Sequence, residues 1–82
     1  MPANVADSPL VIVSHHDKME WSRMAQDAYH SDRNDVAHRY SAYASMRSDT
    51  RLRNDVYQTL MRNYRLWLVG GWRAFDSGEL EG

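Results

Sequence analysis

The sequence of 82 residues contains no cysteine. It can therefore form neither a disulfide nor a thiolate metal site, and it suits a cytoplasmic location, which we expect. A chain this short buries a small core, which supplies on the order of 3–5 kcal/mol of net stability. Because no disulfide adds to that stability, we expect homodimerisation or docking on a larger protein.

Long apolar runs are also missing, so the sequence predicts no membrane span, and no basic segment followed by an apolar run marks a signal peptide. The formal net charge of −1 gives no overall attraction to nucleic acid. The distribution is uneven, however, because residues 47–73 hold six arginines against Asp49 and Asp55, a net +4. Nucleic acid therefore stays open as a partner.

Catalytic and metal-binding motifs are absent as well. Ser14 precedes a histidine but lacks the glycines of a nucleophile elbow, and Gly70-Gly71 follows a helical segment instead of opening one, as a phosphate loop would. The four histidines lack metal-ligand spacing and are expected to be solvated or capping residues: His15, His16, His30 and His38. We expect no enzyme activity, no cofactor, no metal and no small-molecule substrate.

The longest periodic segment, residues 50–69, predicts a helix that Asp49 caps and Gly70-Gly71 ends. Its apolar arc covers about half the circumference, which is typical of a helix that packs against more than one neighbour. Asn63 interrupts this arc, and without hydrogen-bond partners it would cost about 1–3 kcal/mol. The arc consists of Leu52, Val56, Tyr57, Leu60, Met61, Tyr64, Trp67 and Leu68.

Two shorter helices precede it, at residues 15–30 and 34–47, so the predicted fold class is all-α, a small three-helix bundle. Ser14 is the predicted cap of the first helix. The apolar stripe of that helix is Trp21, Met24, Ala25, Ala28 and Tyr29, opposite a solvated face that includes Glu20, Arg23 and Asp27. The stripe of the second helix is small and rich in tyrosine: Val36, Ala37, Tyr40, Tyr43 and Ala44.

The remaining segments complete a single domain over residues 1–82. Residues 1–9 are expected to be a flexible arm, and residues 76–82 an acidic mobile tail. Residues 10–13, Leu-Val-Ile-Val, form a strand-like run with no second strand predicted in the chain. This run is expected to pack as an extended segment, to pair with a second copy of the chain, or to add to a partner's sheet.

Trp, Tyr, Met and Arg are abundant, and these residue types are enriched at the cores of protein interfaces. A three-helix core of this size cannot bury all of them. The sequence therefore predicts a small protein-binding module that acts as a regulator, adaptor or inhibitor of a larger assembly and that also associates with itself. Phage or plasmid origin would fit such a protein. The predicted interface residues are Tyr40, Tyr43, Trp72 and Phe75.

The alternative is a DNA-binding regulator of helix-turn-helix type, with the helix at 50–69 as the recognition helix. The absence of a turn glycine, the length of that helix and its wide apolar arc weigh against this alternative. Its candidate contact residues are Thr50, Arg51, Arg53, Asn54, Arg62 and Arg65.

Overall fold

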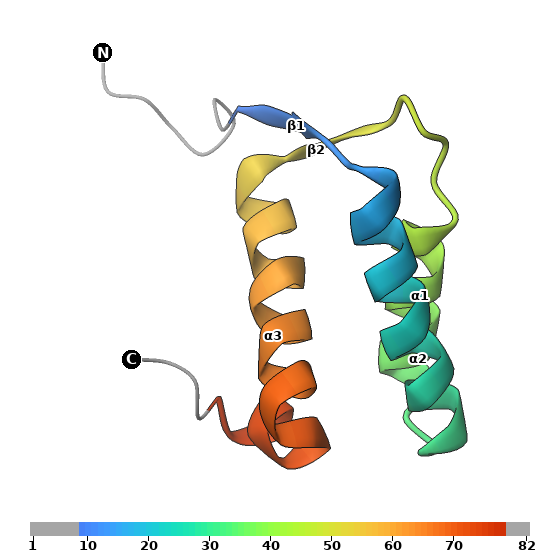
Figure 1. Cartoon of the computed structure of the whole chain (residues 1–82), viewed down its shortest axis with the longest axis vertical. Helices are drawn as coiled ribbons and strands as arrows, with labels where there is room; N and C mark the ends of the chain where they lie inside the picture. Colours follow the sequence, from blue (N-terminus) through green and yellow to red (C-terminus); the bar gives the residue numbers. More distant parts are fainter. Residues whose placement is uncertain (1–8, 79–82) are drawn as a thin grey trace.

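The computed structural model of the protein describes residues 9–78. Its elements are β1 (Leu10–Ile12), α1 (His15–His30), α2 (Asn34–Ala44), β2 (Arg51–Arg53) and α3 (Asn54–Ser77). The two earlier helices form an antiparallel hairpin, α3 stands beside that hairpin, and the two strands cross one end of the bundle (Figure 1). The predicted small helical bundle is confirmed, with a short sheet added to it.

The first helix begins and ends at the predicted residues. The Ser14 Oγ accepts a hydrogen bond from the Asp17 backbone N–H at 3.0 Å, so the predicted cap is also confirmed. The second helix ends at Ala44, three residues before the predicted bound of 47. The Lys18 ammonium donates to the Met46 carbonyl at 2.9 Å, which places a positive charge just beyond the negative end of α2.

The strand-like run at residues 10–13 has a partner within the chain. Strand β1 pairs antiparallel with β2, with Leu10 opposite Arg53 and Ile12 opposite Arg51. The prediction of no second strand is wrong, because Arg51–Arg53, which the sequence pattern places in the first turn of the third helix, forms that strand. Pairing holds these residues extended, so α3 begins at Asn54 and Asp49 does not cap it. Of the expected N-terminal arm, residues 1–8 lie outside the described residues.

The third helix does not end at Gly70-Gly71, as predicted, but bends there and continues to Ser77. Gly71 adopts φ 69°, a left-handed conformation that glycine tolerates and that redirects the chain. A Cβ on Gly70 would collide with the Cβ of Ala74, so the turn closes tightly only with glycine there. Leu66, which lay outside the predicted apolar arc, is buried, whereas Leu68 of that arc is 51% exposed.

Residues 72–77, which follow the bend, contact the turn between α1 and α2, and we call these contacts the clasp. The Arg33 guanidinium donates two hydrogen bonds to the Asp76 carboxylate, at 2.7 and 2.6 Å, and stacks 5.0 Å from the Trp72 ring centre. The Trp72 Nε1–H donates to the Ser31 Oγ at 3.1 Å. Asp76 and Ser77 therefore belong to the folded helix, and residues 79–82 of the expected acidic tail lie outside the described residues.

We expect Asp76→Asn to loosen this clasp while changing the melting temperature little, because exposed ion pairs contribute little to global stability. The hydrogen bond to Arg33 lowers the pKa of Asp76. The clasp is therefore intact at neutral pH and is lost as the pH falls below the ordinary value of 3.8 through the lowered pKa. Faster amide hydrogen exchange over residues 72–77 would show the loosening.

The control is Asp49→Asn, which removes another exposed Arg–Asp pair, with Arg47, far from the clasp. Exchange over residues 72–77 should be unchanged in this variant. Equal protection of that segment in Asp76→Asn and in the native chain would show that the ion pair does not hold it.

The core lies where the inner faces of the three helices meet. Trp21 and Tyr40 are its largest members, at 0% and 1% exposed. Trp21 packs edge-on against Tyr43 of α2 and Tyr57 of α3, with ring centres 6.2 Å apart in both pairs. The other buried side chains of this cluster are Val13, Met24, Ala25, Ala28, Val36, Ala37, Leu60, Met61 and Tyr64.

Aromatic side chains of α3 reach α1 through polar contacts. The Tyr57 hydroxyl donates to Asp17 at 2.9 Å, and the Trp67 Nε1–H donates to Asp27 at 2.8 Å. Burial and the hydrogen bond to Asp17 raise the pKa of Tyr57. The face of α1 predicted to be solvated is therefore partly an interface with α3, because large aromatic side chains reach across to its carboxylates. None of the described helices is both long enough and apolar enough to cross a membrane.

Candidate functional site

A groove runs between α2 and α3, the two helices that lie furthest apart in the bundle. Over residues 34–44 and 54–77, no Cα of α2 comes within 8 Å of a Cα of α3. The space between their side chains is open and has a volume of about 330 Å³. We call this space the α2–α3 groove; its lining residues are Arg39, Tyr43, Asp55, Val56, Thr59, Leu60 and Asn63.

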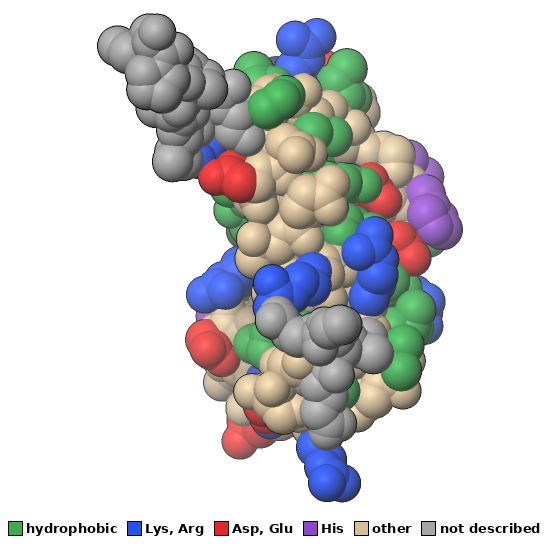
Figure 2. Space-filling model, turned by 90° about the vertical axis from the view of Figure 1, so that its left-hand side faces the viewer, with side chains coloured by type: hydrophobic (Ala, Val, Ile, Leu, Met, Phe, Trp, Pro, Cys, Tyr) green, Lys and Arg blue, Asp and Glu red, His purple; other side chains and the backbone are tan. Residues whose placement is uncertain are grey.

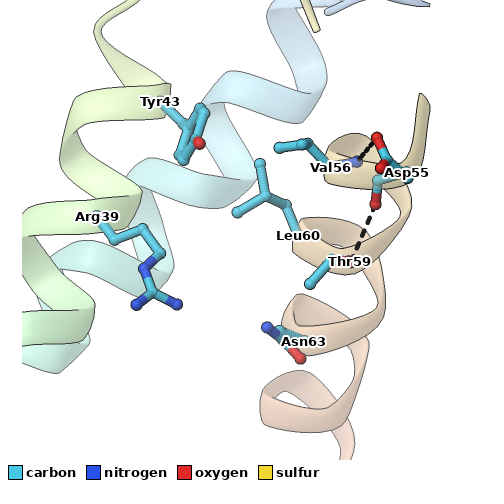
Figure 3. Close-up of a pocket in the computed structure, with 7 residues that line it drawn as sticks. All are labelled: Arg39, Tyr43, Asp55, Val56, Thr59, Leu60 and Asn63. Atoms are coloured by element: carbon cyan, nitrogen blue, oxygen red, sulfur yellow. Dashed lines mark hydrogen bonds between the residues drawn. The ribbon is translucent and has the colours of Figure 1, made fainter. Parts of the chain in front are cut away.

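The two ends of the groove differ in polarity. Because α2 and α3 run in opposite directions, the C-terminal end of α2 lies beside the N-terminal end of α3 (Figure 1). Tyr43 and Val56 face each other at one end, and Arg39 lies opposite Asn63 at the other (Figure 3). Leu60 projects between them and is 3% exposed, so it forms the floor. On each wall the lining residues recur one helical turn apart, which makes the groove parallel to the helix axes.

Two polar side chains on the α3 wall of the groove, Asp55 and Thr59, already have partners. The Asp55 carboxylate accepts from the Arg53 guanidinium at 2.5 Å and from the Val56 backbone N–H at 2.8 Å. The Thr59 hydroxyl donates to the backbone carbonyl of Asp55 at 3.0 Å. Arg39, by contrast, is exposed and makes no ion pair within residues 9–78. The groove therefore offers one available guanidinium beside an apolar floor.

Asn63 lies beside a buried tyrosine behind the groove. The Tyr40 hydroxyl donates to the backbone carbonyl of Leu60 at 3.2 Å. Burial raises the pKa of Tyr40 to about 12, while the neighbouring Asn63 amide opposes this rise. The Asn63 side chain therefore has a polar neighbour at the edge of the core.

The four residues predicted to form a protein interface do not share one surface. Tyr40 is buried in the core and is not accessible to a partner, whereas Tyr43 forms the apolar end of the groove. Trp72 and Phe75 pack edge-on with ring centres 5.6 Å apart, beside the turn that precedes α2. Tyr43 lies at the opposite end of α2, so only this one of the four belongs to the groove.

The helix-turn-helix arrangement considered for nucleic-acid binding is not formed by α2 and α3. Residues 45–53 separate the two helices, and β2 lies within that connection. Thr50, Arg51 and Arg53 belong to the connection and β2, not to a recognition helix, and Asn54 is the first residue of α3. The tight turn that would set two such helices against each other is therefore missing.

Arg62 and Arg65 are exposed one turn apart on α3. Figure 2 looks onto the side of the molecule that α3 occupies, where Lys and Arg side chains gather across the middle of the face. The six nucleic-acid candidates are thus divided between the strand end of the bundle and the outer face of α3.

The sequence did not predict that Arg39, Thr59 and Asn63 line a common groove. A partial signal was present, because Arg39 is four residues before Tyr43 and borders the apolar stripe of α2. The spacing between α2 and α3 was not predictable from that signal, since it depends on how α3 packs against α1. Within residues 9–78, no group of three or more His, Asp or Glu side chains is placed to hold a metal ion.

Comparisons with protein-family models, with curated proteins and with solved structures found no match to this chain. Its function is therefore inferred from the groove and its side chains.

Proposed function

We propose that this chain is a small non-enzymatic protein-binding module, which acts as a regulator, adaptor or inhibitor of a larger protein. Its binding site is the α2–α3 groove. The observation that carries this proposal is the open space of about 330 Å³ between two helices, with a buried leucine as its floor. Grooves between helices accept helical segments of other proteins, which insert apolar anchors spaced by one turn.

Filling the groove should abolish binding without unfolding the protein. Thr59 is exposed at the groove wall, so Thr59→Arg places a long side chain across the space at little cost to stability. Gln58→Arg makes the same change one residue away, at an exposed position outside the groove. In affinity capture from an extract of the source cells, we expect the native chain and Gln58→Arg to retain a partner that Thr59→Arg loses.

Capture of the same partner by all three forms would place the binding site elsewhere, and capture by none would contradict the proposal. Circular dichroism would establish that both variants are folded.

The nucleic-acid alternative retains one supporting observation, the exposed pair Arg62 and Arg65. Salt-dependent binding to a labelled DNA duplex that disappears in a variant with glutamine at both positions would favour that alternative over the groove.

A further inference from the structure

The charge of the α2–α3 groove indicates what kind of segment it takes. Asp55 is neutralised by Arg53 at one end, whereas Arg39 at the other end makes no ion pair within the described part of the chain. Near this guanidinium a ligand carboxylate is favoured and a ligand cation is repelled. An arginine also offers paired N–H donors that match the two oxygens of a carboxylate.

The spacing of the residues along each wall of the groove adds a second requirement that the ligand must meet. Arg39 and Tyr43 are four residues apart on α2, so the cationic end and the apolar end are separated by just over one helical turn, about 6 Å along the axis. Val56 and Leu60 repeat the same spacing on α3. A ligand helix lying along the groove would present an aliphatic side chain to the apolar end and a carboxylate to Arg39, four positions apart in its own sequence.

We infer that the α2–α3 groove binds an acidic amphipathic helix of a different protein, which carries an aliphatic residue and a Glu or Asp four positions apart. This inference rests on the proposed function and specifies the chemistry of the partner. Its aliphatic side chain packs on Tyr43, Val56 and Leu60, and its carboxylate pairs with Arg39.

The helices of a second copy of this chain do not carry an exposed aliphatic residue and a carboxylate four positions apart. The described helices expose three large aliphatic or thioether side chains, Met19, Leu68 and Val69. None has a carboxylate four residues away; the residues at those positions are His15, Arg23, Tyr64, Trp72, Arg65 and Arg73. The acidic helix therefore belongs to a heterologous partner, not to self-association through these helices.

The probe is a displayed library of one stable helix, randomised along one face and selected on the whole 82-residue chain. We expect the native chain to enrich Glu or Asp over Lys or Arg by about tenfold at the position four residues from an aliphatic residue. Arg39→Glu should reverse this preference and enrich Lys or Arg. Arg73→Glu, an exposed change outside the groove, should keep the native preference.

The selected helices are then mapped by NMR on the Asn63 side-chain amide and the Leu60 methyl groups, which line the groove. Identical charge preferences for the native chain and Arg39→Glu would overturn the inference, as would selected helices that leave these signals unmoved, or selection of no helix by the folded protein. Arg39 is exposed, so Arg39→Glu should fold; Arg39→Gln, which should lose the preference without reversing it, provides a second variant.

Failure of this inference is distinguishable from failure of the proposed function. Helices that shift the groove signals with no preference for charge would overturn the acidic partner but leave the groove as a protein-binding site. Loss of a natural partner in Thr59→Arg would likewise support the groove, whatever the charge selected from the library.

Discussion

Trp21→Ala is expected to unfold the protein. Trp21 is 0% exposed and connects all three helices, through Tyr43 of α2 and Tyr57 of α3. Truncation of a buried tryptophan to alanine costs about 3–5 kcal/mol, which is comparable to the net stability expected of a core this small. Far-UV circular dichroism should show loss of helix at room temperature, and no cooperative urea transition should remain.

Two control variants test whether the effect comes from the buried position of Trp21 or from the loss of any tryptophan. Trp72→Ala removes a half-buried ring from the clasp and should leave a folded protein with a cooperative transition. Trp21→Phe should also remain folded, because it keeps a ring in the core. It also removes the Trp21 Nε1–H, which is buried and has no hydrogen-bond partner among residues 9–78. A cooperative transition in Trp21→Ala close to that of the native chain would contradict this account of the core.

Tyr40→Phe should destabilise the protein by about 1 kcal/mol at neutral pH, although it removes only one oxygen atom. That oxygen donates a buried hydrogen bond to the Leu60 carbonyl of α3, and the variant loses this bond. Urea unfolding measures the loss. The exposed Tyr29, at 54%, supplies the control variant Tyr29→Phe, which should unfold at the native urea concentration.

Because of the same hydroxyl, we expect the free energy of unfolding to fall in alkali. The pKa of Tyr40 is raised to about 12 by burial, against an ordinary value of 10.0 for the unfolded chain. The neutral form therefore stabilises the native state fully below pH 10, and this contribution is lost as the pH rises toward 12. Two pKa units correspond to about 3 kcal/mol. Tyr40→Phe should lack this part of the alkaline loss; an unchanged pH profile would rule out the buried hydroxyl as its source.

The sequence alone left the sign of Asn63→Leu open. Replacement would stabilise the protein if Asn63 were unsatisfied in the apolar arc, and would destabilise it if the side chain had partners. Because the Asn63 amide lies beside the Tyr40 hydroxyl and opposes the rise of its pKa, we expect destabilisation. The effects of Asn63→Leu and Tyr40→Phe should also be less than additive, since each variant removes the same interaction.

Local patterns predicted the first helix, its Ser14 cap and most of the core, because periodicity of 3.6 residues and capping chemistry act over a few neighbouring residues. They failed at Arg51–Arg53, which has a helical pattern and yet forms a strand. Its strand partner lies some 40 residues earlier in the chain, a relation that no local window contains. They failed again at Gly70-Gly71, where the bend is stabilised by contacts with the distant Ser31 and Arg33.

By itself, then, the sequence determined three amphipathic helices, the chemistry available on their faces and the absence of cysteine chemistry. Those properties follow from residue type and short-range spacing. Only the tertiary structure decided that α2 and α3 remain apart, that Tyr40 is buried while Tyr43 lines the α2–α3 groove, and that Arg39 faces Asn63 across it. The physical reason is that the position of α3 is set by side chains packed between helices far apart in sequence, such as Trp67 against Asp27.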